Sequence, residues 1–400
     1  MNNLILKSTI AASLLFSVNL YAEDGFDDEF EDEPIEIVKV ETKKSKAYSI
    51  YGSVTASSNY SYRSSQITSA KVSTNTHFDY NFANGYKIKS TLKAYTDQGS
   101  NINNDNDVDL NEIFLQGSIN SKLDIKIGRQ IVVWGKSDNI RITDTINPMD
   151  MTTPGMVDIK DLRLGRFISK ADYFLNNKWS ISTMLLHENR YSTIPEFGSE
   201  YITNDKNNYN MIKVEEPSNS LDNTGFAASL SGNLSGQDIA FYLSNQYIDN
   251  TTYRSNMLGA AYNKVIDSFL LKTEVAYFDN YDSDTIDSKI DSLAGVEYNG
   301  INDGSISFEL ANKNNTTQYS IRFNQSYLNQ TLDFTTLYSE FSDKLFNDGF
   351  VRSWVDYDID DKLTVSFGII DYMGGDDPQF KLIKDNDRVF TSLIYNYSGL

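Results

Sequence analysis

Residues 80–94 read YNFANGYKIKSTLKA and show a pattern that repeats through most of the chain. Ala83-Asn84-Gly85 is a tight-turn signal, and after it apolar and polar residues alternate one by one. Alternation with a period of two gives a β-strand one apolar and one polar face. The apolar positions are Tyr86, Ile88, Leu92 and Ala94, and the polar positions are Lys87, Lys89, Thr91 and Lys93. The stretch therefore predicts an antiparallel hairpin whose second strand has one apolar and one charged face.

The same alternation recurs as far as the C-terminus. It predicts eighteen strands, which begin near residues 47, 67, 86, 108, 123, 164, 178, 224, 237, 252, 267, 289, 305, 317, 330, 349, 362 and 388. All six prolines fall in the N-terminal segment or between the predicted strands. Because proline cannot donate a ladder hydrogen bond, this placement supports the strand assignment.

The connections between the predicted strands alternate in length. Those after even-numbered strands are short, and the longest ones, residues 136–163 and 188–223, follow odd-numbered strands. A bacterial outer-membrane barrel has an even strand number, short periplasmic turns and longer outer loops. We therefore predict an all-β, antiparallel transmembrane β-barrel of about 18 strands (16–18) over residues 47–400, in the outer membrane of a Gram-negative bacterium. A soluble β-sandwich or propeller would not explain the alternating loop lengths.

The composition excludes several classes of function. The 400 residues include no cysteine and only two histidines, so disulfides, thiol catalysis and histidine-rich metal sites are not expected. The formal net charge of -20 argues against a nucleic-acid partner, because phosphate binding needs a basic surface. Neither histidine lies in an arrangement typical of barrel lipases or proteases. We expect no enzymatic activity and no cofactor.

The N-terminus has the composition of an exported protein. Residues 1–22 predict a signal peptide, with Lys7 before a short apolar stretch and Ala22 at the expected cleavage site. Residues 23–46 follow as an acidic periplasmic leader, in which positions 23–36 hold nine carboxylates and no base. Such a segment is typical of an unfolded chain. It is either a disordered tether or a docking segment for a basic periplasmic partner, and both interpretations stay open.

The last predicted strand indicates further partners. Val389, Leu393, Tyr395 and Tyr397 alternate up to the C-terminus, and this strand resembles the terminal strand that the barrel-insertion machinery recognises. An outer-membrane barrel is also expected to contact membrane lipid and lipopolysaccharide. The oligomeric state stays open.

Residues 127–138 read IGRQIVVWGKSD and are followed by Asp144, Asn147-Pro148 and Asp150. This stretch resembles a proteobacterial outer-membrane family catalogued as domain of unknown function 1302. The family's pattern is Gly-Arg-Gln, a variable pair, Val-Trp-Gly, an acidic residue and Asn-Pro-x-Asp. The resemblance covers residues 123–200, including Arg163 and the region of Pro195, Gly198 and Glu200. It implies an outer-membrane barrel of a kind commonly suspected of moving hydrophobic or lipid-like compounds.

Residues 136–163 are expected to fold back into the barrel, because this loop carries an apolar patch that includes Ile140, Ile142 and Ile146. There it would narrow the lumen, and its charges would either select solutes or brace the loop. The residues predicted for this constriction are Arg129, Trp134, Lys136, Asp138, Asp144, Asn147, Asp150, Asp158, Asp161, Arg163 and Arg166. Lys87, Lys89 and Lys93 are predicted to face the lumen as a basic ladder or in pairs with Asp79 and Asp124.

Three functions are compatible with these features. The first is a porin-like channel for small solutes, narrowed by the loop of residues 136–163. The second is a transport barrel for lipids or hydrophobic compounds that works with periplasmic machinery. The third is a structural or adhesive barrel without transport, whose outer loop of residues 188–223 binds partners.

Overall fold

The computed structural model describes residues 47–99, 105–195, 199, 201, 214–279 and 288–399. The predicted signal peptide, the acidic leader and much of the predicted outer loop of residues 188–223 lie outside these ranges. Within them, no helix has the length and apolar character needed to cross a membrane.

The described chain is built almost entirely from β-strands, and every strand begins within three residues of its predicted position. The strands are β1 (Tyr48–Ser61), β2 (Gln66–Asn81), β3 (Lys87–Asp97), β4 (Asp105–Asn120), β5 (Leu123–Gln130), β6 (Arg166–Phe174), β7 (Trp179–Leu186), β8 (Gly225–Leu234), β9 (Gln237–Tyr247), β10 (Arg254–Ile266), β11 (Phe269–Asp279), β12 (Ser288–Ile301), β13 (Gly304–Lys313), β14 (Thr316–Tyr327), β15 (Leu332–Glu340), β16 (Gly349–Asp360), β17 (Leu363–Met373) and β18 (Arg388–Ser398). Three short helices, α2 (Ile159–Leu162), η1 (Leu221–Asn223) and α3 (Pro378–Ile383), lie in connections.

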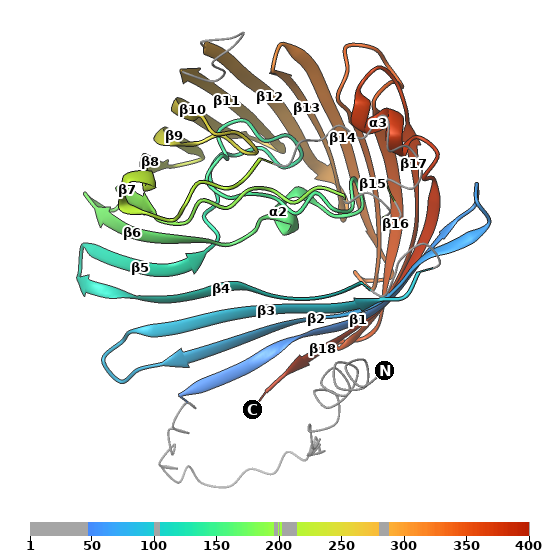
Figure 1. The fold of residues 1–400 in the computed structure, drawn as a ribbon, viewed down its shortest axis with the longest axis horizontal. Coiled ribbons are helices and arrows are strands. Elements are labelled where there is room, and N and C mark those ends of the chain that lie inside the picture. Colours follow the sequence, from blue (N-terminus) through green and yellow to red (C-terminus); the bar gives the residue numbers. More distant parts are fainter. Residues whose placement is uncertain are drawn as a thin grey trace, which may run out of the picture. The chain divides into compact units, whose positions relative to one another are not determined.

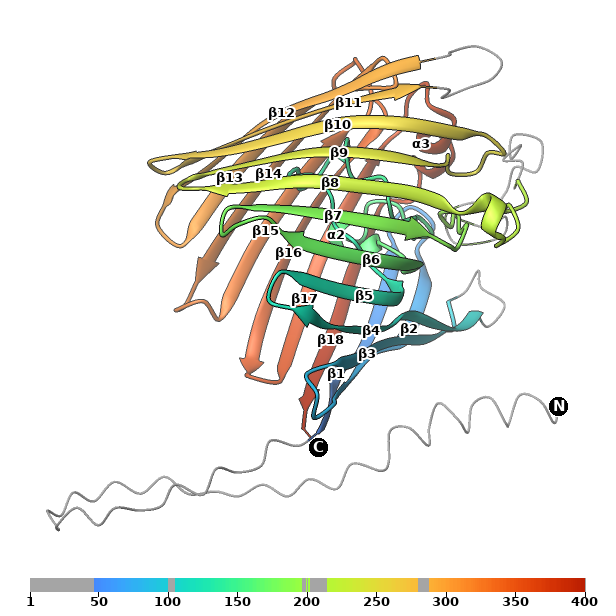
Figure 2. The ribbon, with the colours of Figure 1, turned by 90° about the vertical axis from the view of Figure 1, so that its left-hand side faces the viewer.

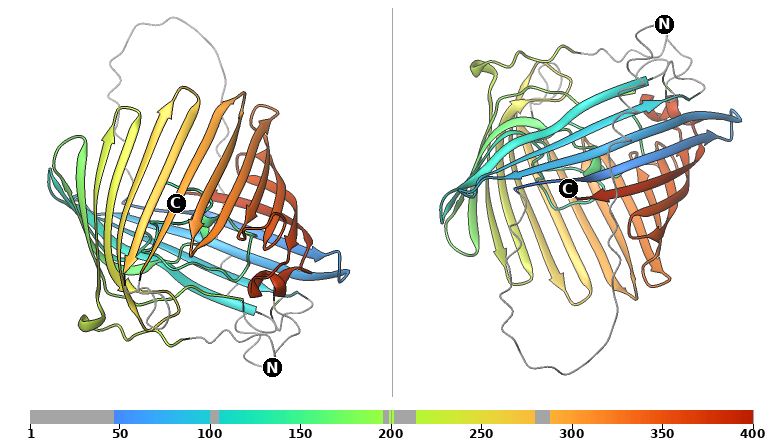
Figure 3. Two further views of the ribbon diagram at one scale, coloured as in Figure 1. Left: turned by 90° about the horizontal axis from the view of Figure 1, so that it is seen from above. Right: turned by 90° about the horizontal axis from the view of Figure 1, so that it is seen from below.

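The strands form one closed ring. Each strand pairs antiparallel with its neighbours in the sequence, as in the β2–β3 pair from Lys71 opposite Asp97 to Asn81 opposite Lys87. β18 then pairs antiparallel with β1, from Arg388 opposite Ser61 to Ser398 opposite Tyr51. Figures 1 and 3 show the resulting barrel with strongly tilted strands. The predicted fold class is confirmed, with 18 strands. Closure leaves no sheet edge unpaired, as a membrane requires.

The predicted turn at Ala83-Asn84-Gly85 connects β2 and β3 in a hairpin. Gly85 has a φ of +87°, which a residue with a side chain rarely adopts, and its N–H donates to the Phe82 carbonyl at 3.1 Å. Across the turn, the Phe82 N–H donates to the Tyr86 carbonyl at 2.9 Å. The turn therefore sets the register in which the charged face of β3 points into the barrel.

Alternation along the strands separates an outer apolar surface from the interior. In β11, Val275 and Tyr277 are 44% and 40% exposed. The residues that alternate with them, Glu274 and Ala276, are 4% and 0% exposed. A soluble protein would not leave such a belt of large apolar side chains in water. The outer surface is therefore suited to the hydrocarbon core of a membrane.

A charge on this outer belt should destabilise the barrel. Leu258 in β10 is exposed between Leu243 and Tyr277 of the neighbouring strands. We expect Leu258→Arg to cost about 2–4 kcal/mol if the residue lies near the bilayer midplane. Urea titration of the barrel in lipid vesicles, followed by heat-modifiable gel mobility, measures this cost. The control is Leu221→Arg in η1, which makes the same change in a connection; equal unfolding midpoints for both variants would contradict the proposed membrane belt.

Candidate functional site

Residues 131–165, called the inner loop here, connect β5 to β6 and carry α2. Figures 1 and 2 show this segment inside the ring of strands, and Figure 3 shows it from above and from below. The loop contains few regular elements, so its backbone groups need partners from elsewhere. Hydrogen bonds to those partners determine the position of the loop.

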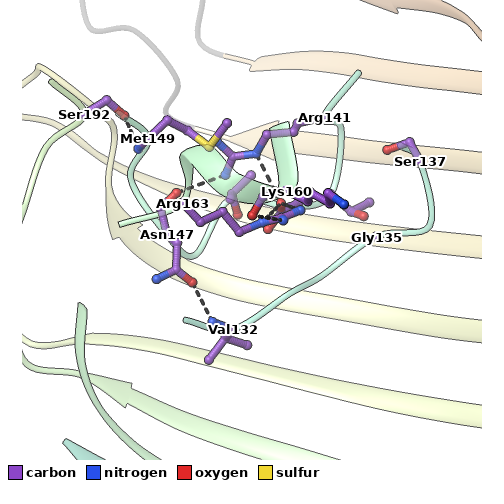
Figure 4. Close-up of polar contacts among 12 residues, drawn as sticks. Val132, Gly135, Ser137, Arg141, Asn147, Met149, Lys160, Arg163 and Ser192 are labelled. Atoms are coloured by element: carbon purple, nitrogen blue, oxygen red, sulfur yellow. Dashed lines mark hydrogen bonds and ion pairs between the residues drawn. The ribbon is translucent and has the colours of Figure 1, made fainter. Parts of the chain in front are cut away.

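Asn147 closes the neck of the inner loop. Its side-chain oxygen accepts from the Val132 N–H at 2.8 Å, and its side-chain nitrogen donates to the carbonyls of Gln130 at 3.2 Å and Leu164 at 2.7 Å. Figure 4 shows Asn147 pointing toward Val132. One amide thus joins the outgoing and returning ends of the loop, which is the structural reason for the Asn-Pro pair in the sequence motif.

Three other motif residues shape the entry to the loop. Gly128 in β5 has a φ of +134°, and a Cβ there would lie 2.3 Å from the Ile113 carbonyl oxygen. Gly135 has a φ of +80°, and a Cβ there would lie 2.9 Å from the Glu274 carboxylate. Between them, the buried Gln130 side chain donates to the Ile168 carbonyl of β6 at 2.9 Å. Both glycines are therefore needed for close contact and for backbone conformation.

Glu274 of β11 is the first anchor on the barrel wall. Its carboxylate accepts from the backbone N–H of Lys136, from that of Ser137 at 2.7 Å and from that of Thr143 at 3.0 Å. The Thr143 hydroxyl adds a fourth bond of 2.8 Å. Hydrogen bonds to an ionised acceptor are roughly twice as strong as neutral ones. A single side chain therefore fixes two separate parts of the loop.

Glu309 of β13 is the second anchor. Its carboxylate accepts from the backbone N–H groups of Asp138 at 2.7 Å, Asn139 at 2.9 Å and Ile140 at 3.1 Å. Nearby, the ammonium of the buried Lys272 in β11 pairs with the Asp138 carboxylate. The turn of the loop at residues 136–140 is thus attached to β11 and β13 of one wall.

α2 attaches the other end of the loop to β14 and β16. Asp158, at its N-terminus, pairs with Arg322 at 2.9 Å and with Arg352, which also donates to the Gly155 carbonyl at 2.9 Å. Burial opposes ionisation of Asp158, but the two guanidinium groups overcome this effect and hold its pKa below the usual value of 3.8. The depressed pKa means that this attachment is present above pH 3.8 and is lost only at lower pH.

Apolar side chains fill the space between the inner loop and β6–β13. Trp134 lies 4.9 Å from the Tyr242 ring of β9, measured between ring centroids, and Ile140, Ile142 and Ile146 lie in the same buried cluster. The wall contributes small residues here: Ala227, Ala240, Ala261, Ala276 and Ala311. Small side chains on the wall leave room for the loop to pack closely against it.

The opposite half of the interior is polar. The inward side chains of β1 and β2 include Ser53, Thr55, Ser73 and Asn75, and all four are half-buried rather than buried. Within the described ranges, no residue of the inner loop makes a hydrogen bond or ion pair to β1, β2 or β3. The loop therefore lies against β6–β13 through an apolar cluster and charged anchors, whereas the half of the interior lined by β1 and β2 stays polar.

Several predicted constriction residues meet one another or the wall. Asp144 pairs with Arg163 at 2.7 Å and Arg141 at 3.2 Å, so these charges brace the loop (Figure 4). Lys136 pairs with Asp238 of β9 at 3.7 Å. Arg166, 4% exposed, donates to the Gln246 side chain at 2.6 Å.

Two predicted residues do not join these contacts. Asp150 accepts from Thr152 and Thr193 within the connections, at 2.5 and 2.9 Å. Asp161 of α2 is exposed.

The prediction that Arg129 faces the lumen is wrong. In β5, Arg129 pairs in register with Ile113 and Phe167, which are exposed residues of the outer face. Its guanidinium contacts Glu188, with Nε 3.2 Å from the carboxylate. Strand alternation explains the error, because Ile127 faces outward and a residue two positions later faces the same way. Arg129 therefore braces the end of the barrel wall.

The predicted lysines of β3 lie on its inward face. Lys89 pairs with Asp79 of β2 at 3.5 Å, as the pairing alternative expected. Asp124 instead accepts from the Ser118 hydroxyl at 2.5 Å. Lys93 lies opposite Asn75 and Asp109, and Lys87 lies opposite Asn81 and Gln116. The polar half of the interior thus carries positive charge along β3.

The wall residues that hold the loop were not predicted from the sequence; they are Glu274, Glu309, Arg322 and Arg352. The alanines of β8–β13 were a usable signal, because inward small residues leave space for an inserted segment.

In the described ranges, no group of three or more histidine, aspartate or glutamate side chains is placed to hold a metal ion. His77 stacks on Tyr51 and contacts Thr91 at 3.0 Å.

Removing the Glu274 carboxylate should release the loop at residues 136–143. Leaving a buried donor unpaired costs about 1–3 kcal/mol, so we expect Glu274→Ala to speed amide hydrogen exchange there by about tenfold or more. Mass spectrometry of the peptide that covers these residues gives the measurement. Glu340→Ala is the matched control, because this buried glutamate binds Tyr338 and Asn347 instead of the loop. Unchanged exchange in Glu274→Ala would show that the loop does not depend on this anchor.

Solved structures share the fold at low sequence identity. Pseudomonas aeruginosa OccK5 (OpdH) is 8% identical, with a TM-score of 0.55 over 88% of this chain and 97% of its own. A mutant of Rh. blastica porin is 12% identical, with a TM-score of 0.43 over 88% of this chain and 100% of its own. The similarity to OccK5 supports the barrel fold.

Sequence comparison identifies the family. No curated protein matches the chain. One family model matches residues 37–342, which extends well beyond the stretch of residues 123–200 that carried the resemblance. The match includes the neck motif, both wall anchors and the arginine that holds α2 from β14. The chain therefore belongs to the family described as "Protein of unknown function (DUF1302)".

Proposed function

We propose that this protein is an outer-membrane channel for small polar solutes, whose lumen is narrowed by the inner loop. The observation that carries the proposal is the division of the interior by the loop. On one side the loop packs against β6–β13 in a buried apolar cluster, and on the other the polar side chains of β1–β3 stay half-buried. A water-filled passage would run along the polar side.

The attachment of the loop supports a fixed constriction. The inner loop binds β9, β11 and β13 on one side and β14 and β16 on the other, through carboxylates and guanidinium groups of the wall. Irregular backbone at membrane depth is tolerated only where protein or a water-filled cavity surrounds it. A segment fixed at so many points sets the width of the passage without large movement.

The alternatives fit the interior less well. A lipid-transport barrel would need a continuous apolar surface along the passage, whereas the apolar inward side chains of β6–β13 in the buried cluster are covered by the loop. Transport of hydrophobic compounds with periplasmic machinery acting through the acidic leader stays the second candidate. The adhesive alternative depends on the outer loop of residues 188–223, part of which lies outside the described residues.

Planar-bilayer recording of the refolded barrel tests the proposal. We expect discrete conductance steps in wild type and a larger conductance after deletion of residues 136–163. Lys93 lies on the polar inward face of β3, and Lys93→Glu replaces a positive charge beside the passage by a negative one. The reversal potential in a salt gradient should therefore shift toward the value for cation selectivity. The matched control is Lys264→Glu, since Lys264 lies opposite the outward Leu271.

Two results would contradict the proposal. One is the absence of conductance in wild type although heat-modifiable mobility shows a folded barrel. The other is an equal reversal potential for Lys93→Glu and Lys264→Glu, which would place the ion path away from β3.

A further inference from the structure

A partly open cavity lies at the end of the barrel that carries the longer connections. It has a volume of about 240 Å³ and is bounded by residues 141–148 of the inner loop, residues 189–192 after β7, and the ends of β9–β13. We call it the rim cavity. Its volume is below the range of about 300–1,000 Å³ that is typical of sites for drug-sized ligands. A ligand that fills it would therefore be a small metabolite.

The charges that line the rim cavity are unequal. Five side chains are basic, namely Arg141, Arg166, Arg190, Lys289 and Lys313, and three are acidic, namely Asp144, Asp249 and Asp291. This excess of positive charge contrasts with the strongly acidic chain as a whole. A cavity lined by one sign of charge attracts the opposite sign.

The acidic residues are already engaged. Asp144 is shared by Arg141 and Arg163, and Asp291 pairs with Lys289 at 2.8 Å. Asp249 accepts from the Ser192 N–H at 2.8 Å. Among the described residues, Arg190 pairs with Asp109 at 3.3 Å, so Arg166 and Lys313 are left without an ion pair, and Asp249 is the one carboxylate of the lining without one.

Two cations of the lining have no carboxylate partner among the described residues. The side chain of Lys313, the last residue of β13, is half-buried and makes no ion pair or hydrogen bond in those ranges; Arg141 and Lys289 repel its ammonium, and Asp291 and Asp144 attract it. The buried Arg166 donates only to neutral acceptors, among them the Gln246 side chain and the Ile146 carbonyl. A buried cation without a counter-charge is costly. A bound anion would remove this cost.

A polar atom of the wall is also unpaired. The Ser244 hydroxyl, on the inward face of β9, is buried without a hydrogen-bond partner among the described residues, and Ser244 is 4% exposed. Buried polar groups without partners call for an explanation such as a ligand. Ile142, Met257 and Phe278 supply an apolar side to the same cavity. The lining therefore combines cationic, hydroxyl and apolar surfaces.

We propose that the rim cavity binds a small organic anion, a carboxylate with a short apolar body, whose charge lies against Lys313 and Arg166 and whose body contacts Met257 and Phe278. A carboxylate accepts hydrogen bonds from lysine, arginine and hydroxyl groups at once. The site would give the barrel a selective binding step beside the passage. This inference goes beyond the proposed function, since binding does not require that the barrel conduct.

Calorimetric titration of the refolded barrel with pentanoate tests the site directly. Pentanamide has nearly the same shape without the charge, and inorganic phosphate has charge without the apolar body. We expect saturable binding of pentanoate that is at least tenfold tighter than binding of either probe. Equal binding of pentanamide would overturn the anion assignment, and equal binding of phosphate would overturn the apolar body. This comparison needs only the wild-type chain.

Variants then locate the binding. Lys313→Gln should weaken pentanoate binding at least tenfold, and Ser244→Leu, which fills the cavity, should abolish it. Lys344→Gln is the control, because Lys344 is an exposed lysine that pairs with Asp376 in a connection. Wild-type affinity in Lys313→Gln would overturn the proposed site. Conductance of the same variants is measured separately, so failure of the binding site is distinguished from failure of the channel.

Discussion

The structure depends on hydrogen bonds from two carboxylates of the barrel wall to the backbone of the inner loop. Glu274 and Glu309 together accept from six backbone N–H groups between residues 136 and 143. An irregular segment inside a barrel cannot satisfy its own backbone, and each unpaired group would cost free energy. The wall supplies the missing acceptors at fixed positions on β11 and β13. The loop's path through the interior follows from this requirement.

The two attachments of the loop use different charged groups of the wall. On β11 and β13, Glu274 and Glu309 bind backbone donors and Lys272 pairs with Asp138. On β14 and β16, two arginines bind Asp158. The inner loop packs against one apolar cluster on β6–β13 and, through Met156, against a second one on β15–β17, whereas the inward side chains of β1 and β2 stay polar. The inner loop is therefore attached to the folded wall on both sides, and the charged groups at these contacts hold the loop in place.

The sequence predicted the barrel well because strand alternation, turn signals and loop lengths are local features. The start of β3 after Gly85 shows this, since the turn and the alternation lie within fifteen residues. The partners of the loop were not predictable, because Lys136 and Glu274 are far apart in the sequence and no local pattern sets their contact. Arg129 was misplaced for a different reason: strand alternation, if applied from Ile127, would have put it on the outer face.

Cysteine accessibility tests the division of the interior most directly, because the chain has no cysteine of its own. Thr55→Cys places a thiol on the polar inward face of β1, and Ala276→Cys places one in the apolar cluster behind the loop. A charged, bulky thiol reagent should react with Thr55→Cys and lower its single-channel conductance, and it should leave Ala276→Cys unmodified. Reaction and block at position 276, with none at position 55, would contradict the account.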